Sequence, residues 1–262
     1  MQGTTMTELA DDELLRYARQ ILLNGWDMDA QLRLKAAHIV IVGAGGLGCP
    51  ASETLARAGV GRITLIDDDM IEASNLQRQT LFVAADIGQS KAMRAAERLT
   101  EINPYIAAVG IKDRLSDDNA ADLLDSGAGL PDLLLDCTDN FATRDSINRI
   151  SLALKIPLLS ASAIGMTGQL SLFEPAKQTG CYHCLFGAPS DDEDTRTCAN
   201  SGVLASTTTV MGNLQANTAL QYLGLGHNPL SGKLLLWDGR SMQQRMMNYK
   251  PDPACPVCHH SS

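Results

Sequence analysis

The residues in this sequence whose type and spacing most directly indicate chemistry are its seven cysteines. Four of them form two Cys-x-x-Cys pairs, Cys181 with Cys184 and Cys255 with Cys258. Two such pairs supply the four thiolates of a tetrahedral zinc site, and four protein ligands leave no open position for catalysis. We therefore predict a structural zinc site that fastens the end of the chain to its middle, with His183 not a ligand. A redox-active pair or two disulfides are the alternative interpretations.

The other three cysteines differ in their surroundings. Cys49 stands at the start of a predicted helix and Cys137 at the end of an apolar strand, so both are expected to be small packing residues. Cys198 lies in the polar segment 189–202, which has neither a helical nor a strand period and is expected to be an exposed loop. Four acidic residues at 191–194 disfavour its thiolate. Cys198 is either a nucleophile or a chance surface thiol.

A glycine-rich segment, GAGGLG at 43–48, follows the apolar run HIVIV and precedes a helical pattern. Glycines let the backbone turn tightly and approach a phosphate, while the helix N-terminus offers unpaired N–H groups to the anion. Asp67 ends the next strand, where a carboxylate can bind ribose hydroxyls. This pattern predicts a nucleotide site, and by itself it leaves a dinucleotide possible.

The residues that follow favour a triphosphate. Arg78 and Lys91 place two cations near the expected phosphate chain, and a triphosphate needs more charge compensation than a dinucleotide does. Asp139 and Asn140 end another strand, at the edge where open α/β sheets collect ligands. A carboxylate there could hold Mg²⁺ that bridges the phosphates. The sequence therefore predicts an ATP site.

These residues require a particular set of elements to bring them together. Short apolar strands alternate with helical patterns through the first 165 residues, which indicates parallel crossover units and a doubly wound, Rossmann-like α/β sheet. After Gly165 the pattern changes to strands of an added antiparallel extension with one helix near 205–223. We expect one domain over 1–262, with a nucleotide-binding core at 8–165 and an extension at 166–258 that contains the cysteine pairs. The strands are expected at 38–42, 62–69, 105–111, 131–140, 156–165, 168–175, 233–239 and 242–248. The helices are expected at 8–23, 88–102, 116–126 and 141–155, with one more that starts at Cys49 after the glycine turn.

Composition limits the class of protein. The 262 residues are 45% hydrophobic and 19% charged, which is typical of a globular chain. A net charge of −9 argues against a general nucleic-acid surface, since phosphate binding needs a basic footprint. No apolar run reaches the length of a membrane span, and the first 13 residues lack the order of a secretory signal. We expect a cytoplasmic protein that binds neither membrane nor nucleic acid.

Taken together, the motifs resemble those of the ThiF/MoeB/HesA family, the bacterial branch related to ubiquitin-activating enzymes. The resemblance rests on RYARQ at 16–20, GAGGLG, IDDDMIEASNLQRQ at 66–79, GQSK at 88–91, DCTDN at 136–140 and the two cysteine pairs. It covers nearly the whole chain, with the motifs in the family's order. It implies an ATP-dependent adenylyltransferase that acts on the C-terminal glycine of a small ubiquitin-like (β-grasp) sulfur carrier ending in Gly-Gly. It also implies that the extension at 166–258 binds this carrier.

The resemblance also implies roles for individual residues. The ATP-binding residues would be Gly43, Gly45, Gly46, Asp67, Ser74, Asn75, Leu76, Gln77, Arg78, Lys91, Asp139 and Asn140. Within that set Asp67 would bind the ribose and Asp139 a magnesium ion. Arg19 would reach the ATP of the other subunit of a homodimer, and Cys198 would act in sulfur transfer.

Several alternatives stay open at this stage. Some stretches, such as CYHCL and LWDGRS, look closer to thiamine-type ThiF proteins, so thiazole (thiamine) biosynthesis is the favoured pathway and activation of molybdopterin synthase the alternative. No rhodanese domain follows in the sequence, so the sulfur is expected to come from another protein such as a cysteine desulfurase. An NAD-dependent oxidoreductase or an inactive nucleotide-binding scaffold are alternatives of other classes. The first leaves Arg78, Lys91, Asp139 and the cysteine pairs without a use, and the presence of every motif residue argues against the second.

Overall fold

A computed structural model describes residues 8–125, 129–188 and 202–258 of the chain. Within them the strands form one sheet in the order β3-β2-β1-β4-β5-β6-β7-β8. The first five strands in the chain pair in parallel, and β6, β7 and β8 extend the sheet with antiparallel pairing. The strands are β1 His38–Val42, β2 Arg62–Ile66, β3 Ala107–Ile111, β4 Leu133–Asp136, β5 Leu158–Ile164, β6 Thr167–Phe173, β7 Lys233–Asp238 and β8 Gln243–Asn248. The predicted fold class, a mainly parallel α/β sheet with an antiparallel C-terminal extension, is confirmed.

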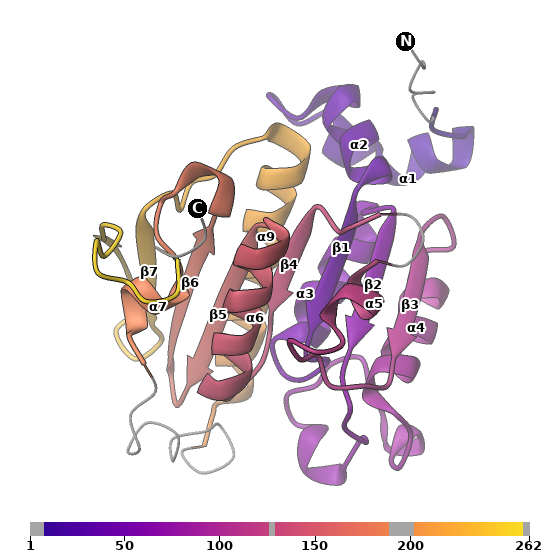
Figure 1. The fold of residues 1–262 in the computed structure, drawn as a ribbon. Helices are drawn as coiled ribbons and strands as arrows, with labels where there is room; N and C mark the ends of the chain where they lie inside the picture. The colour runs from indigo at the N-terminus through magenta and orange to yellow at the C-terminus, as the bar shows by residue number, and fades with distance from the viewer. Residues whose placement is uncertain (1–7, 126–128, 189–201, 259–262) are drawn as a thin grey trace.

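Helices cover both faces of this sheet (Figure 1). Because strand side chains alternate between faces, Ile39 and Ile41 of β1 enter one core and Val40 and Val42 enter the other. The first core contains residues of α2, α3, α4 and α9, and the second contains residues of α5, α6 and α7. The helices are α1 Asp11–Ile21, α2 Asp27–Ala36, α3 Gly48–Ala58, α4 Lys91–Ile102, α5 Ala120–Leu124, α6 Phe141–Leu154, α7 Tyr182–Phe186 and α9 Ala205–Leu225. Strands buried on both faces explain the continuous apolar runs of the sequence.

Two short helices precede the sheet. Figure 1 shows α1 and α2 together, beside the end of the sheet at which β1 begins. In α1, Tyr17 accepts a hydrogen bond from Asn103 Nδ2 at 2.8 Å and Gln20 donates to the carbonyl of Ala58 at 3.2 Å. Ala58 directly precedes β2 in the chain and Asn103 directly precedes β3, so α1 lies at the amino ends of these two strands. The sequence predicted a helix at 8–23, which is longer than the observed α1, and it did not predict α2.

Helix and strand lengths follow local signals. Helix α4 starts at Lys91 rather than at residue 88 because Ser90 caps it, accepting a hydrogen bond from the Met93 N–H at 3.5 Å. Helix α3 ends at Gly59, whose φ of +90° is the left-handed conformation that favours glycine. Among the described residues, no helix combines the length and apolar character that crossing a membrane would require.

Candidate functional site

A cavity of about 480 Å³ lies at the carboxyl ends of the parallel strands. Residues that follow β1, β2 and β4 line one part of it, and the β5–β6 hairpin lines another. Since β1 and β4 are neighbours in the order β3-β2-β1-β4-β5, the cavity lies where the direction of the connections reverses. Open α/β sheets bind their ligands at this point. The volume is in the range of small-molecule sites, roughly 300–1,000 Å³.

The glycine turn lines the cavity at the carboxyl end of β1. Gly43 has a φ of +96°, and a Cβ atom there would lie 2.8 Å from the carbonyl oxygen of Cys137. A Cβ atom on Gly48 would lie 1.9 Å from the carbonyl oxygen of Gly43. Both positions therefore exclude a side chain, and the backbone of Gly45 and Gly46 is left facing the cavity. Helix α3 begins at Gly48, so its N-terminus lies next to this exposed backbone.

Asp67, at the end of β2, is held in place by backbone donors. One carboxylate oxygen accepts from the Ala44 N–H at 2.7 Å and the other from the Asp69 N–H at 2.9 Å. Burial raises the pKa of this carboxyl, while Lys91 acts to lower it. The carboxylate thus links the glycine turn to the loop after β2 and still borders the cavity.

Two cations line the same part of the cavity. Lys91 is 7% exposed, and its Nζ lies 2.6 Å from a carboxylate oxygen of Asp69. Arg78 donates from Nη1 to the carbonyl of Ser74 at 3.1 Å. Both side chains reach the cavity from the segment after β2, beside the glycine turn, and several carboxylates of the same segment also line it.

The end of β4 contributes a carboxylate. Asp139 is exposed and lines the cavity, whereas Asp136, three residues earlier, is buried and accepts from Ser160 Oγ at 2.6 Å. Asn140 also lines the cavity, but its Oδ1 accepts from the Thr143 N–H at 2.8 Å and so caps α6. Asp139 is therefore the residue of this segment that presents an exposed carboxylate to a ligand.

The structure brings together most, and not all, of the residues singled out from the sequence. Those that line the cavity are Gly43, Gly45, Gly46, Asp67, Asn75, Arg78, Lys91, Asp139 and Asn140. Ser74, Leu76 and Gln77 do not line it, and Ser74 instead donates to Glu72 at 3.3 Å. Arg19 is exposed at the end of α1, at the opposite edge of the sheet from the cavity. Cys198 lies outside the described residues.

Gln79 and Thr208 are among the lining residues that the sequence analysis did not predict. Gln79 is 2% exposed and lines the cavity, and its Oε1 has no hydrogen-bond partner among the described residues. Buried amide oxygens are normally paired, so this atom is available to a ligand. Thr208 of α9 lines the cavity next to Gly46. Gln79 directly follows Arg78 in the motif and could have been found there, while no sequence signal connects Thr208 to the site.

The cavity continues beyond the glycine turn. Its second part is lined by the β5–β6 hairpin, the start of α6 and α7. These residues include Phe141, Thr143, Arg144, Ser162, Ile164, Thr167, Gly168, Gln169, Tyr182 and Phe186. The guanidinium of Arg144 is buried here and donates to the carbonyl of Ala161 at 3.2 Å. This second part contains fewer charged side chains than the part beside the glycine turn.

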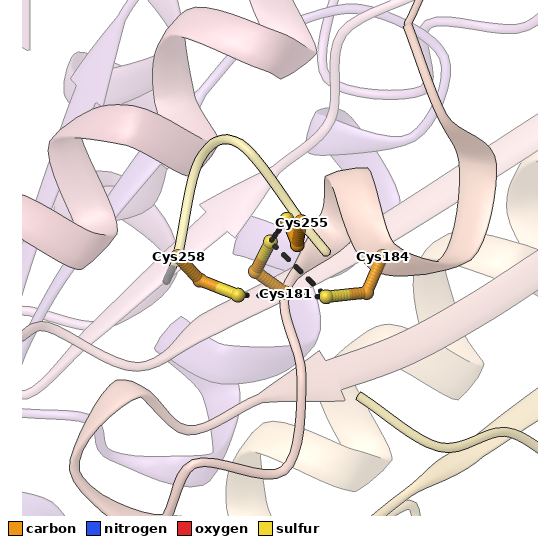
Figure 2. A group of neighbouring side chains, drawn as sticks. All are labelled: Cys181, Cys184, Cys255 and Cys258. Atoms are coloured by element: carbon orange, nitrogen blue, oxygen red, sulfur yellow. Dashed lines mark hydrogen bonds between the residues drawn. The ribbon is translucent and has the colours of Figure 1, made fainter. Parts of the chain in front are cut away.

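The four paired cysteines come together at one point away from the glycine turn. Figure 2 shows their sulfurs facing one another, and all four lie within 4.8 Å of each other. The sulfur of Cys181 lies 3.8 Å from that of Cys184 and 3.8 Å from that of Cys255. The sulfurs of Cys184 and Cys258 are 3.5 Å apart. A disulfide would need about 2.05 Å. Four sulfurs about 2.3 Å from a central zinc ion in a tetrahedron would lie about 3.8 Å apart, so the donor set fits zinc.

The remaining thiols match their expected packing roles. Cys49 is fully buried, and burial raises its pKa to about 12. Burial also raises the pKa of Cys137 well above its usual value. His183 is not part of the sulfur cluster, and its Nδ1 lies 3.7 Å from a carboxylate oxygen of Asp145 instead.

Fold and site together define a doubly wound α/β protein with a glycine turn typical of nucleotide binding and a four-cysteine cluster. Residues 17–257 match the ThiF family, and the chain belongs to that family. The family and the fold class predicted from the sequence are thereby confirmed.

Individual relatives were also found. The chain is 45% identical over 97% of its length to the molybdopterin-synthase adenylyltransferase of Escherichia coli (strain K12), covering 99% of that protein. It is 42% identical over 96% of its length to the sulfur carrier protein ThiS adenylyltransferase of the same organism, covering 98% of it. Among solved structures, Escherichia coli MccB with MccA-N7isoASN is similar at a TM-score of 0.79 and 27% identity, over 93% of this chain and 74% of that one.

Proposed function

We propose that this chain catalyses the ATP-dependent adenylylation of the C-terminal carboxylate of a small ubiquitin-like sulfur carrier. The observation that carries the proposal is the set of residues that line the cavity. One part joins the glycine turn to Arg78 and Lys91, and the other opens along the β5–β6 hairpin, so a nucleotide and a polypeptide end can meet in one space. The relatives are named as adenylyltransferases of molybdopterin synthase and of ThiS, which agrees with the predicted enzyme class.

The chemistry requires positioning more than proton transfer. The carrier's ionised carboxylate attacks the α-phosphorus of ATP, the bond from that phosphorus to the bridging oxygen breaks, and pyrophosphate leaves with the electron pair. No general base is needed, because the nucleophile has no proton to lose. The backbone of the glycine turn, Arg78 and Lys91 hold the phosphates and balance the charge that develops on the leaving group. Asp67 is placed to accept from the ribose hydroxyls.

Asp139 fits the requirements of a magnesium ligand. Its exposed carboxylate borders the cavity, and Mg²⁺ binds through one or two carboxylates together with substrate phosphates. When bound, the ion would neutralise phosphate charge. The four-cysteine cluster would hold zinc structurally and tie the C-terminal segment to α7.

The remaining parts of the proposal concern partners. Arg19 lies too far from its own cavity to act there, which supports a homodimer in which it serves the partner's site. Cys198 would take part in sulfur transfer, with the sulfur supplied by a separate donor such as a cysteine desulfurase. The thiazole pathway stays the favoured expectation and molybdopterin the alternative, since identities of 45% and 42% do not separate them.

The experiment is carrier-dependent ATP–pyrophosphate exchange with each candidate carrier, with the carrier acyl-adenylate detected by mass. We expect exchange with the wild-type enzyme, and its loss by at least about 100-fold in Asp139→Ala, since that removes the proposed ligand of the Mg²⁺ ion that would balance phosphate charge in the transition state. Asp122→Ala, an exposed carboxylate on α5 outside the cavity, is the matched control and should retain exchange. Near-wild-type exchange by a folded Asp139→Ala enzyme would sink the assignment. An NAD-dependent oxidoreductase or an inactive scaffold would show no exchange at all.

A further inference from the structure

The short segment between β4 and α6, residues 137–140, carries the exposed carboxylate of Asp139. The pairing of β4 with β5 ends at Asp136 and Ser160, and Asp139 comes three residues after Asp136, outside any helix or strand. Its side chain borders the cavity. A connecting segment without ladder hydrogen bonds does not fix its own side chains. Contacts from neighbouring elements must therefore hold Asp139 at the cavity.

The buried carboxylate of Asp136 makes several of these contacts. Asp136 is 1% exposed, and a buried charge is costly unless it is paired and hydrogen-bonded. One of its oxygens accepts from the Thr138 N–H at 3.0 Å and from Thr138 Oγ1 at 2.7 Å. The other accepts from Ser160 Oγ at 2.6 Å and lies 3.9 Å from Nε of Arg144. Asp136 thus fixes Thr138, the residue directly before Asp139, to the end of β5.

The guanidinium of Arg144 holds the same residue from α6. Its Nη2 donates to the carbonyl of Thr138 at 2.5 Å and to that of Ala161 in β5 at 3.2 Å. The N–H, the hydroxyl and the carbonyl of Thr138 are therefore all hydrogen-bonded. From α9, Gln215 donates to one carbonyl in β4 and one in β5, at 3.0 and 2.8 Å. The end of β4 is consequently held by side chains from both helix layers, at the place where the two strands separate.

We propose that Thr138 is a positioning residue for Asp139: the buried pair of Asp136 and Arg144 holds Thr138, and Thr138 in turn fixes the Asp139 carboxylate for a divalent cation that binds with ATP. The inference rests on the proposed function, since that function gives Asp139 its metal-binding role. Preorganisation is the physical means, because a carboxylate on a fixed backbone loses less conformational freedom when it binds an ion. Thr138 does not need to touch the ion for this role.

The test separates the hydroxyl of Thr138 from its size. Thr138→Val removes the hydrogen bond to Asp136 and keeps the shape of the side chain, whereas Thr138→Ser keeps the hydroxyl. Thr218→Val is the matched control, because the Thr218 hydroxyl donates to the carbonyl of Leu214 at 2.9 Å and Thr218 does not line the cavity. Thermal unfolding of each variant checks that the fold is kept.

The first measurement does not depend on activity. The affinity for Mn²⁺ is determined by electron paramagnetic resonance in the presence of α,β-methylene-ATP, in which the bond that the reaction would break is stable. We expect Thr138→Val to weaken Mn²⁺ binding about tenfold, Thr138→Ser to bind Mn²⁺ more tightly than Thr138→Val, and Thr218→Val to match wild type. Arg144→Met removes the donor to the Thr138 carbonyl and should also weaken Mn²⁺ binding. Wild-type Mn²⁺ affinity in folded Arg144→Met would overturn the part assigned to Arg144.

A double-mutant cycle shows whether Thr138 acts through Asp139. In the Asp139→Ala background, Thr138→Val should change the Mn²⁺ affinity less than about twofold, because the group that it positions is absent. In carrier-dependent ATP–pyrophosphate exchange, Thr138→Val alone should raise the Mg²⁺ concentration for half-maximal rate about tenfold. The KM for the carrier should stay within about twofold of wild type.

The possible failures are distinguishable. Wild-type Mn²⁺ affinity in folded Thr138→Val, or an equal loss with and without the Asp139 carboxylate, would overturn the positioning role and leave the proposed function standing. Wild-type Mn²⁺ affinity in Asp139→Ala would overturn the metal-binding role of Asp139 and the inference with it. Absence of exchange by the wild-type enzyme with every carrier would overturn the proposed function itself.

Discussion

At the residue scale, Gly46 shows how a single missing atom makes the nucleotide site possible. A Cβ atom at this position would lie 3.0 Å from Cγ2 of Thr208 and 3.3 Å from Cγ of Arg78. These contacts are shorter than ordinary van der Waals packing allows, so one neighbour would have to move. Because Arg78 is one of the cations that line the cavity, we expect the substitution to weaken ATP binding rather than to destabilise the fold.

Gly46→Ala should therefore raise the KM for ATP about tenfold, because the added methyl group displaces Arg78 and occupies space in the cavity. The double variant Gly46→Ala/Thr208→Ser should recover part of this loss, because serine lacks the methyl group nearest to the new Cβ atom. Initial rates of pyrophosphate exchange over a range of ATP concentrations give both values, with Thr208→Ser alone as the control. If the double variant has the same raised KM as Gly46→Ala, the contact between the new Cβ atom and Thr208 is not the cause of the rise.

At the element scale, the loop between β2 and α4 supplies Arg78 and Gln79 to the cavity. The buried carboxylate of Asp86 joins this loop to α4. Asp86 is 3% exposed, accepts from the Val83 N–H at 2.9 Å and pairs with Arg94 Nε at 2.8 Å. Burial acts to raise its pKa, but the Val83 N–H and the Arg94 guanidinium outweigh it and hold the pKa of Asp86 below its usual range. The loop's geometry thus depends on an ionised group.

Asp86→Asn should lower the free energy of unfolding by about 1–3 kcal/mol at pH 7, since it weakens hydrogen bonds to a charged group. A depressed pKa gives stability that is present above the unfolded-state value, about 3.9, and is lost as the pH falls through the folded value. The difference between variant and wild type should consequently shrink below about pH 4. Urea unfolding at pH 7 and pH 3 measures it, with the exposed Asp118→Asn as the control. A difference that stays constant with pH would contradict this account.

At the scale of the whole molecule, the position of Arg19 concerns assembly. Leu15 and Leu22, on and beside the same helix, are 79% and 78% exposed, so α1 carries both a free cation and an uncovered apolar surface. A homodimer formed through this region would cover the leucines and would be needed to bring Arg19 to a cavity. The expectation that Arg19 acts on the partner's ATP follows from the family resemblance.

Co-expression of Arg19→Ala with Asp139→Ala tests this arrangement. If Arg19 acts across the interface, each mixed dimer contains one intact site and one doubly altered site. Because random pairing makes about half of the dimers mixed, about a quarter of wild-type pyrophosphate exchange should be restored. If Arg19 acted within its own chain, every site would lack one residue and the mixture would stay inactive. Each variant expressed alone is the control.

Much of this protein could be predicted without coordinates. The alternation of strands and helices, the added antiparallel strands and the residues of the glycine turn are all local patterns, and the structure places them as expected. Helix α2 was missed because its apolar residues show little helical periodicity. Ser74, Leu76 and Gln77 were grouped with the site because the motif is continuous, whereas a turn of chain presents only some of its residues to one side.

The sequence by itself determined the family, the fold class, the two cations and the pairs of cysteines, because each of these is carried by neighbouring residues or by a repeated period. Only the tertiary structure decided that Gln79 has a buried amide oxygen at the cavity with no partner in the described part of the chain, and that Thr208 packs against Gly46. It also decided that Tyr182 and Phe186 line the same cavity. These placements arise from packing between elements far apart in the chain, and the direction in which a side chain points there is set by its neighbours in space rather than by its neighbours in sequence.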